Sequence, residues 1–163
     1  MRIILAAVLV LGLTACAENS GKGPGLKAGS GNNQEKTENV TDYGACGNYS
    51  PRNIEGSWQM QQRAGEINFT MVMDIYRGYL NLSNECELHG RRLTARVSSP
   101  VYYDSSTLEV YSDGYDQQKV DEPGFKFTCD VSMTKSRMRY QFRGRCLELS
   151  QDGSSQKVIL VPR

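Results

Sequence analysis

The chain has 163 residues, in which 19 Lys and Arg residues nearly balance 18 Asp and Glu residues, with one histidine and five cysteines. This balance provides no global field to draw the protein to nucleic acid or to an anionic membrane surface. The length allows one domain and a tail. One histidine and no C-x-x-C motif leave no usual ligand set for zinc, so we expect neither a metal nor another cofactor.

The N-terminal residues predict an exported protein. Met1-Arg2 carries one positive charge, residues 3–13 form an uninterrupted apolar run, and small residues follow before Cys16. A permanent transmembrane helix needs about 20 apolar residues, so this shorter run is typical of a secretory signal peptide. An ordinary signal peptide followed by a chance cysteine remains the alternative.

The ending Leu13-Thr14-Ala15-Cys16 resembles the lipobox of bacterial lipoproteins. The resemblance implies that residues 1–15 are a removed signal peptide and that Cys16 carries the acyl chains, which together anchor the protein stably to a membrane. Ala17, rather than Asp, at the next position resembles lipoproteins sorted to the outer membrane. We therefore expect a lipid-anchored protein of the cell envelope, at the outer membrane and facing the periplasm or the cell surface.

Residues 16–45 predict a flexible tether behind the lipidated cysteine. They are rich in Gly, Ser and Asn and carry few apolar side chains, so nothing offsets the entropy cost of ordering them. A flexible segment of about 25 residues has an end-to-end distance of roughly 25–30 Å, which separates a domain from the lipid headgroups. Residues 46–163 then form the folded domain.

Within the folded domain, apolar and polar residues alternate in short runs between turn residues, which predicts an all-β fold. Residues 67–75, 80–86 and 92–97 form two successive hairpins, with Gly78 and Gly90 in two-residue turns. The predicted inner-face pairs are Ile75–Leu80, Met73–Leu82, Met71–Asn84, Phe69–Cys86, Cys86–Leu93, Asn84–Ala95 and Leu82–Val97. A single apolar face therefore runs through three strands in register.

The second half of the domain predicts further antiparallel strands. Residues 112–124 read as the longest loop, residues 125–133 and 138–142 as a hairpin, and residues 158–161 as the closing strand. With the first strand at residues 58–62, the strands number about eight. Short connections favour a small antiparallel up-and-down β-barrel, which leaves no open edge. A two-sheet β-sandwich is the alternative.

The cysteines predict two disulfides. Setting Cys16 aside for lipid leaves Cys46, Cys86, Cys129 and Cys146, an even number in an exported chain. In the predicted hairpin Cys129 lies opposite Phe142, four residues from Cys146, which is too far for a bond between their sulfur atoms. We therefore predict the pairs Cys86–Cys129 and Cys46–Cys146.

Gly56-Ser57-Trp58 opens the first strand, and this G-x-W motif resembles that of the lipocalin, or broader calycin, superfamily over residues 54–163. The resemblance implies a lipocalin-like barrel in which Gly56 and Trp58 lie at one closed end. It also implies that Arg163, beyond the last strand, packs on Trp58 through a cation–π contact.

The sequence offers no motif for an enzyme. Paired cysteines do not act as nucleophiles, and the single histidine, His89, lies in a predicted turn. We expect instead a binding module, which contacts an envelope or extracellular protein through its loops and outer face. The alternative is a carrier of a small hydrophobic ligand inside the barrel. The inward side chains are bulky and an eight-stranded barrel is narrow, which favours the first interpretation.

The candidate binding rim consists of His89, Tyr111 and Tyr115. Meander geometry predicts that the turn at His89, residues 112–124 and residues 150–156 meet at one end of the barrel, with both tyrosines on or beside that end. Tyrosine is favoured in interfaces because it buries a large area for little lost entropy.

The outward-facing side chains of residues 134–145 are strongly cationic. They are Lys135, Arg137, Arg139, Arg143 and Arg145. A row of this kind suits an acidic partner or phosphate groups, although a solvated strand face has the same composition.

Overall fold

The computed structural model describes residues 46–48, 50–152, 154 and 156–163. The predicted signal peptide at residues 1–15, the lipidated Cys16 and the tether at residues 16–45 lie outside these described residues. The strands are β1 (Gly56–Ala64), β2 (Ile67–Tyr76), β3 (Tyr79–Leu88), β4 (Arg91–Tyr103), β5 (Thr107–Val110), β6 (Gly114–Glu122), β7 (Phe125–Met133), β8 (Ser136–Arg143), β9 (Cys146–Gln151) and β10 (Lys157–Pro162). The described part contains no helix of the length and apolarity that a membrane span needs.

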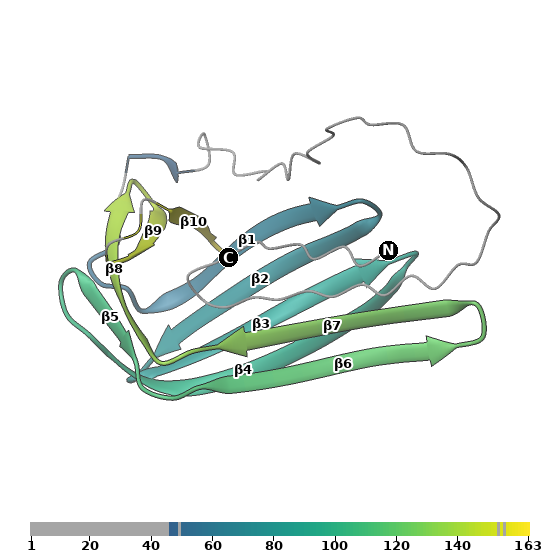
Figure 1. The fold of residues 1–163 in the computed structure, drawn as a ribbon. Helices are drawn as coiled ribbons and strands as arrows, with labels where there is room; N and C mark the ends of the chain where they lie inside the picture. Colours follow the sequence, from purple (N-terminus) through teal and green to yellow (C-terminus); the bar gives the residue numbers. More distant parts are fainter. Residues whose placement is uncertain (1–45, 49, 153, 155) are drawn as a thin grey trace, which may run out of the picture.

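Eight of these strands close into an antiparallel barrel, which confirms the predicted fold class. Around the barrel the order is β1, β10, β9, β8, β5, β4, β3 and β2. Barrel strands that follow one another in the chain are therefore neighbours, and two further pairs, β5 with β8 and β1 with β10, complete the ring. The other two strands, β6 and β7, form a separate two-stranded sheet, which lies along β3 and β4 (Figure 1).

The two hairpins predicted from residues 67–97 have the expected register. Met73 of β2 lies opposite Leu82 of β3, and Leu82 lies opposite Val97 of β4. In each turn the first residue has a positive φ, 50° at Arg77 and 49° at His89, and a glycine with φ of 76° follows. Two positive φ values in succession match the twist of a two-residue hairpin, and this local geometry sets the register.

Strand β4 continues to Tyr103, beyond the predicted end at Val97. Proline normally ends a central strand because it has no N–H to donate. Pro100 is accommodated because it stands where the β4–β5 ladder begins, and its carbonyl accepts a hydrogen bond from the Tyr111 N–H at 3.2 Å. Because Pro100 has no N–H, one backbone hydrogen bond is missing, and it is missing at the end of a ladder and not within it.

The prediction for residues 112–142 was wrong in its strand pairing. Residues 114–122 form strand β6 rather than part of a loop, and β7 pairs with β6 along its whole length, from Gly114–Met133 to Glu122–Phe125. Strand β8 pairs instead with β5 and β9. The alternation of β7 indicates which of its faces is buried, but it does not identify the partner strand.

The β6–β7 hairpin is attached to the edge of β4 by polar side chains. Asp116 Oδ2 accepts a hydrogen bond from the Arg96 N–H at 2.8 Å, and Glu122 forms a bidentate contact with Arg91 at 3.1 and 3.2 Å. A carboxylate therefore occupies an edge position that a neighbouring strand would otherwise fill.

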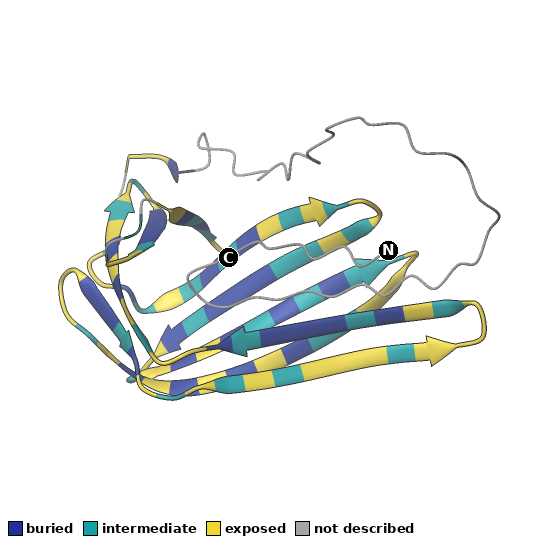
Figure 2. Cartoon of the chain, viewed as in Figure 1, coloured by how far each residue is buried: buried dark blue, intermediate teal, exposed yellow. Residues whose placement is uncertain are grey.

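The apolar residues form two clusters, one in the barrel and one under the hairpin (Figure 2). The barrel cluster includes Trp58, Met73, Leu82, Met138 and Leu149, all at most 3% exposed. The other cluster contains Cys86, Phe127 and Cys129, with five partly buried apolar neighbours: Ile67, Phe69, Leu88, Leu93 and Phe125. Figure 2 shows that β7 is largely buried and β6 largely exposed.

Both predicted disulfides are confirmed. Cys46 is bonded to Cys146 with their Cα atoms 5.0 Å apart, and Cys86 to Cys129 with their Cα atoms 5.7 Å apart. The reason given for this pairing does not hold, because Phe142 lies opposite Leu147 of β9 rather than opposite Cys129. The Cys86–Cys129 pair follows instead from the packing of the β6–β7 hairpin on β3.

Candidate functional site

The residues predicted to close the barrel lie together, but their contacts differ from the lipocalin pattern. Trp58 is 3% exposed, and its indole N–H donates to the Ile54 carbonyl at 2.9 Å. Its ring packs on Phe142, with centroids 5.8 Å apart. Gly56 lies against the same indole with a φ of 145°.

The expected cation–π contact between Arg163 and Trp58 is replaced by polar contacts. The Arg163 backbone N–H donates to the Ser57 carbonyl at 3.0 Å. Its guanidinium lies 3.3 Å from Glu85 on β3. The cause is electrostatic, because a carboxylate attracts a guanidinium more strongly than an aromatic ring does.

The predicted rim does not form a single surface. His89 lies in the β3–β4 turn, where its Nε2 is 2.9 Å from Glu66 Oε2 and its ring is 6.2 Å from Phe125. Tyr111 lies at the other end of β4, opposite Pro100. The β6–β7 turn does lie beside His89, as expected, but Tyr111 is separated from it by the length of β4.

Tyr115 also lies apart from the other two residues. It is the second residue of β6 and is 61% exposed. The preceding Gly114 contacts Val97, near the middle of β4. Residues 112–124 are therefore not a loop at one end of the barrel, because pairing of β6 with β7 places Tyr115 beside the middle of β4.

The structure instead places Tyr111 in a row of outward-facing aromatic residues. Tyr76 lies opposite Tyr79, Tyr79 lies opposite Pro100, and the Pro100 carbonyl accepts the hydrogen bond from Tyr111. Tyr102 follows two residues after Pro100 on the same face of β4. We call these five residues the tyrosine row. It crosses β2, β3 and β4 and ends at Tyr111, the residue after β5. Cβ atoms of directly opposed residues in such a sheet are only about 4.5–5.5 Å apart.

The tyrosine row is open to solvent. The exposed fractions are 58% at Tyr76, 55% at Tyr79, 54% at Tyr102 and 50% at Tyr111. The intervening residues of the same strands, such as Ile75, Leu80 and Val101, fill the barrel. Sequence alternation alone would have put Tyr76 and Tyr79 on the outer face. Pro100 and Tyr102 were missed because the predicted strand ends at Val97, whereas β4 continues to Tyr103.

Cations flank both ends of the tyrosine row. The Arg77 guanidinium carbon lies 4.8 Å from the centre of the Tyr76 ring. At the other end, a small groove of about 420 Å³ is lined by Glu109, Val110, Tyr111, Lys135, Ser136 and Arg137. The aromatic surface therefore continues directly into the cationic face of β8.

A larger groove of about 890 Å³ lies beyond it, on the outer face of the barrel. Its lining comes from the β4–β5 and β9–β10 turns and from strands β5, β8, β9 and β10. The lining residues are Ser105, Ser106, Thr107, Arg137, Arg139, Tyr140, Gln141, Phe142, Glu148, Ser150, Asp152 and Lys157. We call this the arginine groove. Two residues of the cationic row predicted for residues 134–145, Arg137 and Arg139, line this groove.

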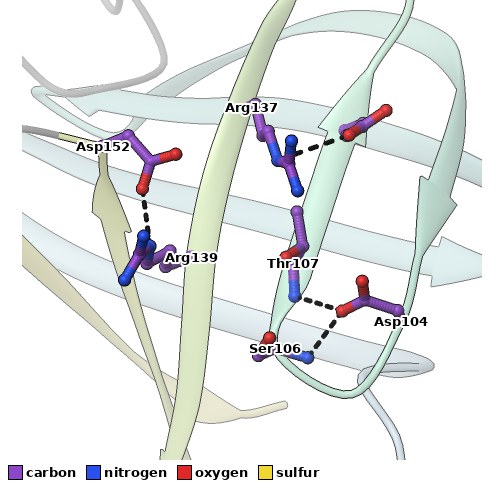
Figure 3. Close-up of polar contacts among 7 residues, drawn as sticks. Asp104, Ser106, Thr107, Arg137, Arg139 and Asp152 are labelled. Atoms are coloured by element: carbon purple, nitrogen blue, oxygen red, sulfur yellow. Dashed lines mark hydrogen bonds and ion pairs between the residues drawn. The ribbon is translucent and has the colours of Figure 1, made fainter.

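One wall of the arginine groove is a turn organised by Asp104 (Figure 3). Its Oδ1 accepts hydrogen bonds from the N–H groups of Ser106 at 2.8 Å and Thr107 at 2.7 Å. These two bonds stabilise the carboxylate and hold the pKa of Asp104 below its ordinary value. The Tyr140 hydroxyl donates to the Asp104 carbonyl and ties the same turn to β8.

The floor contains a buried carboxylate shared by two cations. Glu148 is 3% exposed and lies 2.5 Å from Arg143 Nε and 2.7 Å from Lys157 Nζ. Gln141 also donates to it at 2.6 Å. Burial acts to raise the pKa of Glu148, but these hydrogen bonds and charges outweigh it, so the pKa lies below its ordinary value.

The described residues show no constellation for nucleophilic or metal chemistry. The four described cysteines are all in disulfides. His89 contacts a single carboxylate at an exposed turn, and no three His, Cys, Asp or Glu side chains of the described part gather as metal ligands. What the outer face offers is contact area, charge and hydrogen-bond donors. Comparisons of this chain with protein-family models, with curated proteins and with solved structures found no match.

Proposed function

We propose that this chain is a non-enzymatic lipoprotein of the cell envelope whose lipocalin-like barrel binds a protein partner through the tyrosine row. The tyrosine row is the observation that carries the proposal. Monomeric soluble proteins seldom expose contiguous apolar surface without a use for it. Tyr is enriched in protein interfaces because a large, rigid ring loses little entropy on binding.

The cations beside the row indicate what kind of partner fits. Arg77 stands at one end and Lys135 and Arg137 at the other, so a partner with acidic residues around an apolar centre complements this face. Arginine, together with tyrosine, is also enriched among residues that dominate binding energy. The lipid anchor predicted at Cys16 would hold the domain at the membrane where such a partner resides.

The alternative of a carrier with a hydrophobic ligand inside the barrel receives less support. The barrel interior is occupied by the protein's own side chains, including Met73, Leu82, Met133 and Met138, each at most 1% exposed. A ligand in that space would have to displace them, and close-packed cores resist such change. Both grooves described above lie on the outside.

Site-specific photo-crosslinking in intact cells tests this proposal. A photoreactive residue at position 79 or 111 should form a discrete crosslinked product with one protein, whereas the same residue at position 115 on β6 should not. Tyr115 is the matched control because it is equally exposed but lies off the row. Crosslinks at all three positions alike, or to lipid alone, would contradict a specific protein site.

The second half of the test compares the affinities of two variants for the crosslinked partner. The Tyr79→Ser/Tyr111→Ser variant should weaken binding of the crosslinked partner at least tenfold, because both rings are removed from the centre of the interface. The control Tyr115→Ser should bind like the wild type. An unchanged affinity in the double variant would overturn the proposal.

A further inference from the structure

We infer that the arginine groove is a separate binding site for a phosphate group carried on a hydroxylated molecule. The inference does not depend on the tyrosine row. It rests on two guanidinium groups that leave the same face of β8, on the hydroxyl groups around them, and on the excess of cations over carboxylates in the lining.

Arg137 and Arg139 alternate with inward-facing residues on β8, so both side chains leave the same outer face of the strand. Figure 3 shows them turned to opposite sides of β8, Arg137 toward β5 and Arg139 toward β9. Each contacts its carboxylate through Nε: Arg137 lies 3.4 Å from Glu109, and Arg139 lies 2.6 Å from Asp152. Both arginines line the groove.

The terminal amino groups of these arginines remain available for a ligand. Among the contacts between described residues, the hydrogen bonds and ion pairs of both guanidinium groups use Nε. The two terminal nitrogens are the pair that grips a phosphate or carboxylate in bidentate fashion. Two such groups can share the several oxygens of one phosphate, whereas a single carboxylate has only two oxygens to offer.

The charges of the groove favour an anion. Three lining cations, Arg137, Arg139 and Lys157, stand against two lining carboxylates, Glu148 and Asp152. The two arginines are the most exposed of these groups, with 62% and 75% of their side chains accessible, whereas Lys157 and Asp152 are each 49% accessible and Glu148 is 3% accessible. The most accessible charges of the lining are therefore the two guanidinium groups.

The existing ion pairs present little obstacle to a ligand. Exposed pairs such as Arg139–Asp152 contribute little to stability because water screens them. A phosphate that takes up the free edges of Arg137 and Arg139 adds hydrogen bonds without requiring either Nε contact to break.

Hydroxyl groups around the cations point to a carrier that is itself hydroxylated. Ser105, Ser106 and Ser150 line the groove, and their hydroxyls donate to none of the described residues. Such hydroxyls can exchange hydrogen bonds with a sugar, since each can both donate and accept. A phosphorylated sugar therefore fits the groove, whether as a free molecule or as the headgroup of a glycolipid.

Calorimetric titration of the full chain with glucosamine 1-phosphate, and with glucosamine as the ligand without phosphate, tests the inference. Binding of the phosphorylated sugar alone is expected. The Arg137→Gln/Arg139→Gln variant should lose at least tenfold in affinity. The matched control Arg91→Gln/Arg92→Gln removes the same net charge from two exposed arginines at the far end of β4 and should bind normally.

Flotation with vesicles distinguishes the two sources. Phosphatidylcholine vesicles with and without a glycolipid whose sugars carry phosphate are compared, using chain that lacks the acyl anchor. Glycolipid-dependent flotation that is lost in Arg137→Gln/Arg139→Gln identifies a headgroup, whereas calorimetric binding without flotation identifies a free ligand. Equal loss in both arginine variants would show a non-specific charge effect, and absence of binding in both assays would overturn the inference. Neither result would bear on the crosslinks from positions 79 and 111.

Discussion

Cys86 of β3 and Cys129 of β7 are covalently joined although their strands belong to different sheets. Beside this bond, the Asn84 side chain donates to the Asp130 carbonyl at 2.6 Å. The two contacts attach the β6–β7 hairpin to the inner face of the long strands. An isolated two-stranded hairpin is at best marginally stable in water, so this attachment accounts for its order.

The first prediction concerns that attachment. The Cys86→Ser/Cys129→Ser variant should lose about 2–4 kcal/mol of unfolding free energy, because a bond across a sequence separation of 43 no longer restricts the unfolded chain. Hydrogen exchange should accelerate in β6 and β7 more than in β8–β10. Uniform acceleration across all strands would show that the hairpin does not open separately.

The second prediction concerns two glycines with nearly the same backbone conformation. Gly144 has a φ of 57° and Gly65 a φ of 59°. A Cβ at Gly144 would overlap the carbonyl oxygens of Cys46 and Gly47, whereas nothing lies within 4 Å of a Cβ at Gly65. Gly65→Ala should cost only the left-handed strain of about 1–2 kcal/mol.

Gly144→Ala should cost clearly more than Gly65→Ala, because the segment that holds Cys46 against β9 must also move. Denaturant unfolding, followed through the fluorescence of Trp58, the one tryptophan of the chain, measures both variants. Equal losses in the two variants would contradict the close approach of Cys46 and Gly47 to this turn.

The third prediction concerns the pH dependence contributed by Glu148. Its pKa is lower in the folded protein than in the unfolded chain, so its ion pairs stabilise the fold above the unfolded pKa of about 4.3. That contribution is lost as the pH falls through the folded pKa. At pH 7 the Glu148→Gln variant should lose about 1–3 kcal/mol of unfolding free energy. This loss is smaller than that expected for breaking a fully buried ion pair, because Arg143 and Lys157 are half-exposed.

The difference in unfolding free energy between wild type and Glu148→Gln should shrink as the pH falls below the unfolded pKa of about 4.3, and it should vanish below the folded pKa, where the wild-type carboxylate is protonated as well. Asp121→Asn is the control, because its pair with Lys126 is exposed on both sides, and it should change stability little at any pH. If the unfolding free energies of wild type and Glu148→Gln differed by the same amount at pH 7 and pH 3, the role assigned to the Glu148 charge would be refuted.

The fourth prediction separates function from folding at the tyrosine row. Tyr79→Ser/Tyr111→Ser should change the unfolding free energy by less than about 2 kcal/mol, since each ring is half-exposed and loses only cross-strand contacts. Met73→Ala, at a position with no exposed surface, should lose about 2–5 kcal/mol. A comparable loss in the tyrosine variant would assign the row a structural role.

Local sequence patterns predicted much of the fold. The turns at Gly78 and Gly90 and the alternation on either side of them predicted the register of β2, β3 and β4, because two-residue turns leave a hairpin little freedom. The parity of the cysteines likewise predicted two disulfides, whereas the argument that assigned their pairs rested on a strand pairing that the structure does not contain. Where neighbouring strands are joined by a short turn, pairing follows from nearby residues.

Long-range pairing did not follow from local patterns. The polar sequence of β6 has no apolar alternation that would predict a strand, and it forms one because β7 needs a partner while covering β3 and β4. The chain then returns to the barrel so that β8 pairs with β5. Since alternation identifies only the buried face of a strand, the identity of its partner depends on which surfaces remain to be covered.

The sequence by itself determined the all-β class, the inner faces of the strands and the number of disulfides, and the prediction of export and a lipid anchor rests on it alone. Tertiary structure decided which side chains meet on the outside. The tyrosine row draws on three strands and the residue after a fourth, and the arginine groove draws on four strands and two turns. Such surfaces arise only when the barrel closes, because closure brings side chains together that are distant in the chain.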